Sequence, residues 1–211
     1  DVRVEAEVDA LADAVRAEWG QVDVLCNNAG VFVGGLIWER PAADLEYVLG
    51  VNLWGILHGI RAFVPGMIAQ GTPGHVVNTC SIAGHHVAGY SGPYCISKFA
   101  ALAATESLAR DLELAGGALK VTALCPGMVD TSIGTKSEAR RPDALRTEVT
   151  ESQEVVTKIM LEVASRGIDP AEVGQMVVQA IRDETFLLFT HQHHAGPLAD
   201  RARDLGAGRL P

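Results

Sequence analysis

The segment that decides how this chain is interpreted reads Tyr94-Cys95-Ile96-Ser97-Lys98. A strongly helical run follows it, so the Tyr94 phenol and the Lys98 ammonium are expected one helical turn apart on the same side of a helix. A phenol that exchanges a proton near neutral pH needs its anionic form stabilised, and a lysine at i+4 supplies a positive charge at close range. The segment therefore predicts an acid/base pair.

Outward from this segment, further polar motifs follow predicted apolar strands. The run Asn27-Asn28-Ala29-Gly30 ends the strand at 22–26, Ser81 follows the strand at 75–80, and Pro126-Gly127 ends the strand at 120–125. Asn52 lies within a densely apolar helix that Pro41 opens. These strands alternate with helical patterns, which predicts an α/β fold.

Four of these residues, Asn52, Ser81, Tyr94 and Lys98, resemble in order and spacing the catalytic tetrad of the short-chain dehydrogenase/reductase family. A Tyr-x-x-x-Lys pair alone occurs by chance in many helices, whereas several motifs in family order on the expected elements are specific. The resemblance runs from about residue 1 to residue 190. It implies a doubly wound, mostly parallel Rossmann-type sheet with helices on both faces.

The resemblance also implies a role for each member of the tetrad. Tyr94 exchanges a proton with the substrate, and Ser81 joins it in polarising a carbonyl oxygen. Lys98 lowers the tyrosine pKa and bonds the nicotinamide ribose, and Asn52 holds a water that relays protons from the lysine. Local sequence alone leaves two other interpretations open, a turn-capping role for Ser81 and an amide bonded to backbone in a helix kink for Asn52. The match to the family favours the functional roles.

A nicotinamide cofactor, NAD or NADP, is implied as well. The residues that match the family's cofactor contacts are Asp1, Val2, Asn27, Asn28, Ala29, Gly30, Tyr94, Lys98, Pro126, Gly127, Val129 and Thr131. In the family, an Asp-Val pair lies along the adenine ring, and the positions of Val129 and Thr131 bond the nicotinamide carboxamide. The residues that separate NAD from NADP follow the family's second strand, so the choice between them stays open.

One motif of the family has no counterpart here, the Thr-Gly-x-x-x-Gly-x-Gly turn that binds the pyrophosphate at a helix N-terminus. The start, Asp1-Val2-Arg3-Val4, resembles the segment after the family's third strand. With each βαβ unit taking ~30 residues, we expect that on the order of 60 residues, an N-terminal βαβαβ portion, are missing from the front.

Composition narrows the class of protein. The 211 residues, 48% hydrophobic, are most simply a single domain over residues 1–211. A formal net charge of −9 argues against nucleic acid or an anionic membrane as a partner, and no uninterrupted apolar run approaches a membrane span. The cysteines show no Cys-x-x-Cys spacing, and three close apolar strands as buried thiols do, which suits a reducing cytoplasm.

The remaining segments predict a lid and no metal site. Residues 132–142 are polar and basic, a helical pattern follows through 155–163, and in the family this region is a mobile lid that sets substrate selectivity. His191, His193 and His194 are close in sequence, but acid or cysteine ligands at motif spacing are lacking, so no metal is expected. A solvated loop pair is favoured for His85 and His86, with contact to substrate as the alternative.

The sequence thus favours an oxidoreductase that transfers hydride between a nicotinamide cofactor and an alcohol or carbonyl substrate, with Tyr94 as general acid/base. The expected partners are a small alcohol or ketone and further copies of the chain, as a homodimer or homotetramer. One alternative is a non-catalytic fragment or binding module that keeps the tetrad by ancestry. Another is a lyase-type relative similar to halohydrin dehalogenases, which Lys98 disfavours because those use arginine at that position.

Overall fold

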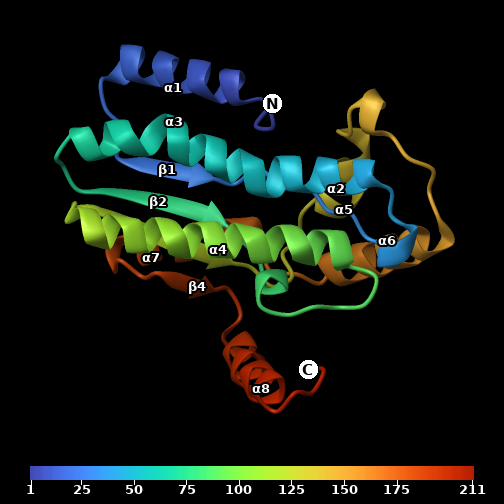
Figure 1. Ribbon diagram of the computed structural model, residues 1–211. Coiled ribbons are helices and arrows are strands. Elements are labelled where there is room, and N and C mark those ends of the chain that lie inside the picture. The colour runs from blue at the N-terminus through green and yellow to red at the C-terminus, as the bar shows by residue number, and fades with distance from the viewer.

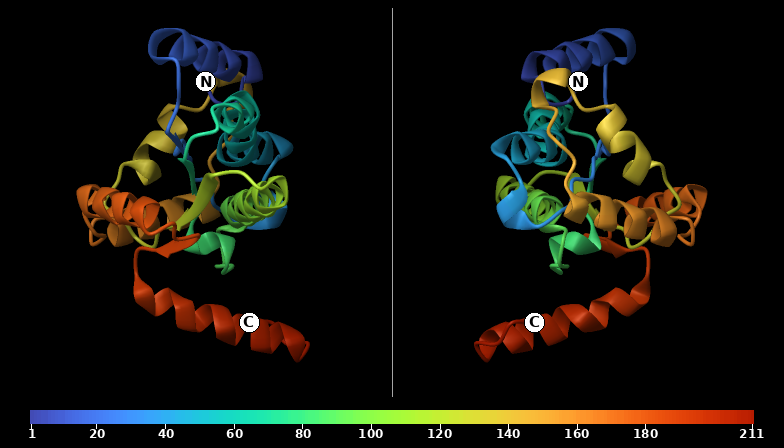
Figure 2. Two further views of the ribbon diagram at one scale, coloured as in Figure 1. Left: turned by 90° about the vertical axis from the view of Figure 1, so that its left-hand side faces the viewer. Right: turned by 90° about the vertical axis from the view of Figure 1, so that its right-hand side faces the viewer.

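The computed structural model describes residues 1–211, and its centre is a parallel sheet with helices on both faces (Figures 1 and 2). The strands lie in sequence order, β1 Val24–Asn27, β2 Gly74–Thr79, β3 Leu119–Cys125 and β4 Leu187–Phe189. Each pair is parallel, so every connection is a crossover that carries a helix. The predicted α/β class, with a parallel Rossmann-like sheet, is confirmed.

Helices α3 Gly55–Ala69 and α4 Gly92–Ala115 cover one face of the sheet, and α7 Pro170–Arg182 covers the other (Figure 2). Helix α1 Glu5–Trp19 lies outside α3, beside the β1 edge. Local chemistry sets several of the boundaries. Gly20 ends α1 in the left-handed conformation with φ 77°, and the Asp169 side chain caps α7 by accepting the Ala171 amide at 2.7 Å.

The core lies between the sheet and the α1, α3, α4 layer. Its largest cluster joins Val8, Ala12, Phe63, Val64, Met67, Val76, Leu108, Leu112, Leu119 and Val121. A second cluster beneath the strand ends includes Cys80 and Cys125, both almost fully buried. These clusters fix the carboxyl ends of β1, β2 and β3 at one edge of the sheet, where ligands bind in doubly wound folds.

The helix that Pro41 opens is continuous from Ala42 to Ala69 but changes its winding. Regular helix α2 Ala42–Leu49 leads into a π-helical turn, η2 Gly50–Trp54, and then into α3. The joined helix has 28 residues and is long and apolar enough to cross a membrane by length and composition, which uninterrupted apolar runs did not indicate. Half of the most apolar stretch of this helix is buried inside the fold, as in the core helix of a globular domain.

Beyond β3, three helical segments form the lid region, α5 Ile133–Ala139, the 3₁₀ turn η4 Asp143–Leu145 and α6 Glu151–Ala164. Other 3₁₀ turns of the same length occur at η1 Ile37–Glu39, η3 Ile82–Gly84 and η5 Gln192–His194. The last helix, α8 Ala195–Gly206, extends away from the sheet (Figure 1). The polar stretch at 132–142 is therefore partly helical, which its composition did not indicate.

The expectation that all three cysteines at the ends of apolar strands are buried is wrong for one of them. Cys80, Cys95 and Cys125 are buried, but Cys26 is exposed. It lies on β1, which is an edge strand of the sheet, and its neighbour on the same face, Val24, is 46% exposed. An apolar strand sequence predicts burial only where another layer covers that face of the strand.

Candidate active site

A cavity of about 790 Å³ opens at the carboxyl ends of the first three strands. The strand ends, the start of α4, the lid and α7 form its walls. It brings together most of the predicted site residues, namely Asn28, Ala29, Gly30, Ser81, Tyr94, Lys98, Pro126, Gly127, Val129 and Thr131. Segments that are far apart in the sequence therefore meet at one site.

Tyr94 and Lys98 lie in the first turns of α4, as predicted. The helix begins at Gly92 with Pro93 at an early position, where a missing amide proton costs nothing. The Tyr94 ring is half-buried and packs against Phe32 with centroids 5.1 Å apart. The Lys98 ammonium lies 5.8 Å from the centre of the Tyr94 ring and donates to the Thr79 carbonyl at 2.8 Å. The i+4 spacing thus places both groups against one wall of the cavity.

Burial shifts the acidity of both groups. It raises the pKa of Tyr94 to about 12, and hydrogen bonding with Ser81 opposes that rise. It lowers the pKa of the Lys98 ammonium, which is only 2% exposed, to about 8. Desolvation is the largest influence on the phenol, and Lys98 is not among the groups that shift its pKa in this structure, so the expected lowering by Lys98 stays a prediction.

Ser81 directly follows β2, and its backbone is extended. Its hydroxyl accepts the Ala83 amide at 3.1 Å, so it caps the 3₁₀ turn η3. The same hydroxyl lines the cavity and is hydrogen bonded to Tyr94, which lowers the phenol pKa. The capping interpretation is therefore confirmed, and it does not exclude the site role, which stays a prediction, because one hydroxyl can accept one bond and donate another.

Asn52 lies in the π-helical turn, is fully buried and does not line the cavity. Its Oδ1 accepts the Val31 amide at 2.8 Å, while its Nδ2 donates to the Val31 carbonyl and to Ser97 Oγ, each at 2.9 Å. Ser97 donates in turn to the Tyr94 carbonyl at 2.7 Å. The amide thus does bond backbone, but across the fold, and it joins the loop after β1 to the turn that carries Tyr94.

Gly30 and Gly127 both line the cavity, but only Gly127 is closely packed. A Cβ on Gly30 would come within 3.6 Å of Asn52 Oδ1 and 3.8 Å of Lys98 Nζ. A Cβ on Gly127 would lie 2.6 Å from His191 and 2.8 Å from His194, closer than real side chains allow. A side chain at 127 would force the two histidine rings to move, so glycine lets the turn after β3 pack against the C-terminal segment.

Other predicted cofactor residues lie apart from the cavity. Asp1 pairs with Arg3, and the Val2 carbonyl lies 2.8 Å from His58 Nδ1, so this pair contacts the side of α3. Asn27 turns its amide toward Asn78 at 2.9 Å and away from the cavity. The structure brings Asn28 to Gly30 into the cavity wall but leaves Asp1, Val2 and Asn27 outside it.

Two arginines and an aspartate that the sequence did not single out fasten the lid. Asp44, on α2, is fully buried and accepts hydrogen bonds from Arg40 at 3.2 Å, from Arg141 and from Thr147 at 2.9 Å. Arg141 also donates to Glu138 at 2.9 Å. The i,i+4 spacing of Arg40 and Asp44 is a sequence signal for the first pair, but nothing local predicts the contact with Arg141.

The five histidines that the sequence singled out lie in three environments. His86 lines the cavity, whereas His85 lies 3.5 Å from Cys125 Sγ and packs on the Phe189 ring. The rings of His191, His193 and His194 gather with centroids 4.2 to 5.7 Å apart. No group of three or more histidine, cysteine, aspartate or glutamate side chains is placed to hold a metal ion.

A family model described as short chain dehydrogenase matches residues 1–142, which includes the strand ends, Ser81, Tyr94 and Lys98. The chain belongs to the short-chain dehydrogenase family. The match covers more than half of the chain, and the fold around the cavity agrees with it.

Named relatives of this short-chain dehydrogenase are oxidoreductases. It is 33% identical over 207 residues to 1-deoxy-11-beta-hydroxypentalenate dehydrogenase of Streptomyces avermitilis, covering 97% of this chain and 69% of the relative. It is 31% identical over 216 residues to the CLA biosynthesis dehydrogenase/reductase of Lactiplantibacillus plantarum, covering 100% and 75%. The probable oxidoreductase EphD of Mycobacterium tuberculosis is 33% identical over 182 residues, covering 86% of this chain but only 30% of the relative.

Solved structures give the same family. A short-chain dehydrogenase/reductase from Burkholderia phymatum, crystallised in complex with NAD, matches with a TM-score of 0.97 and 38% identity over all of this chain and 76% of that one. A putative short-chain dehydrogenase from Novosphingobium aromaticivorans matches with a TM-score of 0.76 and 30% identity, over 100% and 67% of the two chains. The dehydrogenase/reductase character of the family is therefore shown, and the chemistry of this chain's own residues is a separate question.

Proposed function

We propose that this short-chain dehydrogenase interconverts an alcohol and a ketone or aldehyde by hydride transfer with NAD or NADP. The observation that carries the proposal is the convergence of the Ser81 and Tyr94 hydroxyls in one cavity, with the Lys98 ammonium against the same wall. Two hydroxyls aimed at one oxygen are what polarisation of a carbonyl requires. The names of the hydroxypentalenate dehydrogenase and the CLA dehydrogenase/reductase support an alcohol or carbonyl substrate.

In this proposal each side chain has a separate task. Tyr94 donates a proton to the substrate oxygen in reduction and accepts it in oxidation, and Ser81 holds that oxygen by hydrogen bonding. Lys98 keeps positive charge near the phenol once it ionises. Asn52 holds the turn of Tyr94 through Ser97 and, by resemblance to the family, supports a water that relays protons.

The cavity fits a nicotinamide dinucleotide, which supplies the hydride acceptor or donor when bound. None of the lining residues is acidic, although the chain carries a formal net charge of −9. An anionic dinucleotide is therefore not repelled where it would lie. We propose that Asn28, Ala29, Gly30 and the turn from Pro126 to Thr131 hold it. Contacts of Asp1, Val2 and Asn27 with the cofactor stay predictions.

The test is Tyr94→Phe, which keeps the ring and removes the hydroxyl. Turnover of alcohols, followed by nicotinamide absorbance, should fall by about 10²- to 10⁴-fold because the general acid/base is lost. Tyr90→Phe is the matched control, since Tyr90 is exposed and does not line the cavity. Equal activity of Tyr94→Phe and wild-type protein would refute this mechanism.

Fluorescence titration with NADH and NADPH tests the cofactor directly. Saturable binding of one of them supports the oxidoreductase and gives the coenzyme preference. A folded sample that binds neither would favour the alternative of a non-catalytic binding module that keeps the tetrad by ancestry. A homodimer or homotetramer and a cytoplasmic location stay predictions.

A further inference from the structure

The charge of the cavity lining differs from that of the whole chain. Of the 26 acidic residues in the sequence, none is among the 35 that line the cavity. The lining does include three basic residues, Lys98, Lys136 and Arg140. Lys98 is engaged with the Thr79 carbonyl deep in the wall. The two others come from the lid and need a different explanation.

Lys136 and Arg140 stand one turn apart at the C-terminal end of α5. The Arg140 amide donates to the Lys136 carbonyl at 3.1 Å, so the two side chains leave the backbone on the same side. Neither forms an ion pair or a side-chain hydrogen bond, although the neighbouring Arg141 contacts both Asp44 and Glu138. Two cations at i,i+4 repel each other, which is an arrangement that an anion placed between them would relieve.

The rest of α5 is fixed to the body of the protein, so the backbone that carries these two exposed cations has a defined position. The Ser137 hydroxyl accepts the Phe32 amide at 2.9 Å, and the Ser137 carbonyl accepts the Tyr47 hydroxyl at 2.8 Å. Arg141 anchors the next turn to Asp44. A cationic pair on an anchored segment loses less conformational freedom when it binds an anion than a pair on a free loop.

Apolar side chains from the loop after β1, the lid and α7 also line the cavity. They include Phe32, Ile133, Met160, Ala164, Val173 and Val177. Such a lining favours a hydrocarbon body, while Ser81 and Tyr94 offer hydroxyls and the pair offers positive charge. The cavity is therefore built for a molecule with an apolar middle and two different polar ends.

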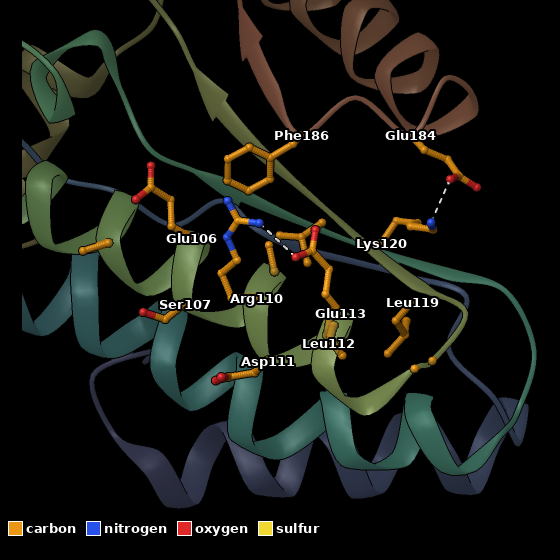
Figure 3. Close-up of a pocket in the computed structure, with 15 residues that line it drawn as sticks. Glu106, Ser107, Arg110, Asp111, Leu112, Glu113, Leu119, Lys120, Glu184 and Phe186 are labelled. Atoms are coloured by element: carbon orange, nitrogen blue, oxygen red, sulfur yellow. Dashed lines mark hydrogen bonds and ion pairs between the residues drawn. The ribbon is translucent and has the colours of Figure 1, made fainter.

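A second hollow, of about 910 Å³, also has basic side chains in its lining, but in a different setting (Figure 3). It lies at the C-terminal end of α4, and its basic residues are already neutralised. Arg110 pairs with Glu113 at 2.9 Å and Lys120 with Glu184 at 3.0 Å. No cation there is left for an external anion.

We propose that Lys136 and Arg140 bind the carboxylate of an otherwise apolar hydroxy- or keto-acid whose alcohol or carbonyl lies at Ser81 and Tyr94. The inference rests on the proposed function and gives its substrate class. A guanidinium can hold a carboxylate through two parallel hydrogen bonds, and the lysine adds a third donor. Phosphate groups of the dinucleotide share this anionic chemistry, so the experiment separates the two sources.

The first arm measures binding without turnover. Isothermal titration with octanoate and with the uncharged 1-octanol is compared for wild-type protein, the double variant Lys136→Ala/Arg140→Ala, and Lys158→Ala. Lys158 is an exposed lid lysine outside the cavity lining, with no ion pair. Octanoate affinity should fall about tenfold or more in the double variant only, since hydrogen bonds to a charged group are lost, and 1-octanol affinity should not change. Equal octanoate affinity in the three proteins, or no octanoate binding by wild type, overturns the proposal.

The second arm titrates NADH into the same three proteins. Unchanged NADH affinity in the double variant, together with weakened octanoate binding, assigns the pair to the substrate carboxylate. A loss confined to NADH assigns it to cofactor phosphates and overturns the proposal. The octanoate arm needs no hydride transfer, so a protein that binds octanoate through the pair but turns over no alcohol refutes the proposed function alone.

Discussion

Two buried polar clusters lie along the continuous helix from Ala42 to Ala69, and they differ in charge. The cluster around Asn52 is neutral and joins an amide, backbone groups and the Ser97 hydroxyl. The cluster around Asp44 is ionic and joins its carboxylate to Arg40 and Arg141. Both helix residues are 0% exposed, so burial does not distinguish them.

The neutral cluster positions groups without placing a charge in a region of low dielectric. Each polar atom of the Asn52 side chain has a partner at 2.8 to 2.9 Å. Such a closed set fixes the turn of Tyr94 relative to the loop after β1 at little desolvation cost. None of its members ionises near neutral pH, so its hydrogen bonds do not depend on pH.

The ionic cluster connects segments that are nearly a hundred residues apart, but it depends on one carboxylate. Two guanidinium groups converge on Asp44, and the Nε atoms of Arg40 and Arg141 have no hydrogen-bond partner. Removing the charge at the centre would leave the buried Arg40 without a counter-ion and Arg141 with only Glu138. The comparison indicates that the helix uses neutral bonds beside the candidate site and charged bonds where it holds the lid.

Asp44→Asn should have the largest effect. The amide keeps the shape but removes the buried anion, so the free energy of unfolding should fall by about 3 to 5 kcal/mol. Urea denaturation measures it. Asp143→Asn is the control, because Asp143 and Arg146 form an exposed pair and its loss should cost less than about 1 kcal/mol. Similar losses in the two variants would show that the ionic cluster is no more than a surface contact.

Asn52→Ala should have the next largest effect and lower the free energy of unfolding by about 2 to 3 kcal/mol. It leaves the Val31 amide, the Val31 carbonyl and the Ser97 hydroxyl without their partner in a buried region. Ser97→Ala, which removes one member and leaves the Val31 bonds intact, should cost about 1 kcal/mol in the same assay. If Ser97→Ala is the more damaging change, Asn52 is not the centre of the neutral cluster.

The smallest expected effect is a pH dependence that comes from Lys98. Its folded pKa of about 8 lies below the ordinary value of 10.5, so the unfolded state holds more protons between these values. Stability should therefore rise with pH across that window, by about 2 kcal/mol between roughly pH 7 and pH 9.5. The raised pKa of Tyr94, about 12, acts oppositely only above its ordinary value of 10.

Lys98→Met isolates this contribution, since both proteins share the other titrating groups. Urea denaturation at about pH 7 and pH 9.5 should show the rise in wild type and a smaller rise in the variant. If stability depends on pH identically in wild type and Lys98→Met, the Lys98 ammonium is solvated in the folded protein. The lysine would then belong with the exposed cations rather than with the buried polar groups beside Asn52.

The predictable part of the candidate site follows from short-range rules. The i+4 spacing placed Tyr94 and Lys98 on one side of α4, and the strand ends placed Ser81 and Gly30 at one edge of the sheet. Asp1, Val2 and Asn27 show the limit of that reasoning, because a motif fixes a place along the chain while side-chain direction depends on neighbours. Lys136 and Arg140 were visible only as part of a basic stretch until α5 brought them to the cavity.

By itself, the sequence determined the alternation of helices and strands and the order of the family motifs. It also determined where α1 ends, at Gly20, and where α7 begins, after Asp169. Periodicity, capping and spacing decide these features because they act over a few residues. Tertiary structure alone decided which polar groups share a cluster and how their acidity shifts. Arg141 meets Asp44, Cys26 is left exposed, and the phenol of Tyr94 has a raised pKa. Desolvation and long-range pairing depend on what surrounds a side chain in space, and the local sequence does not contain that information.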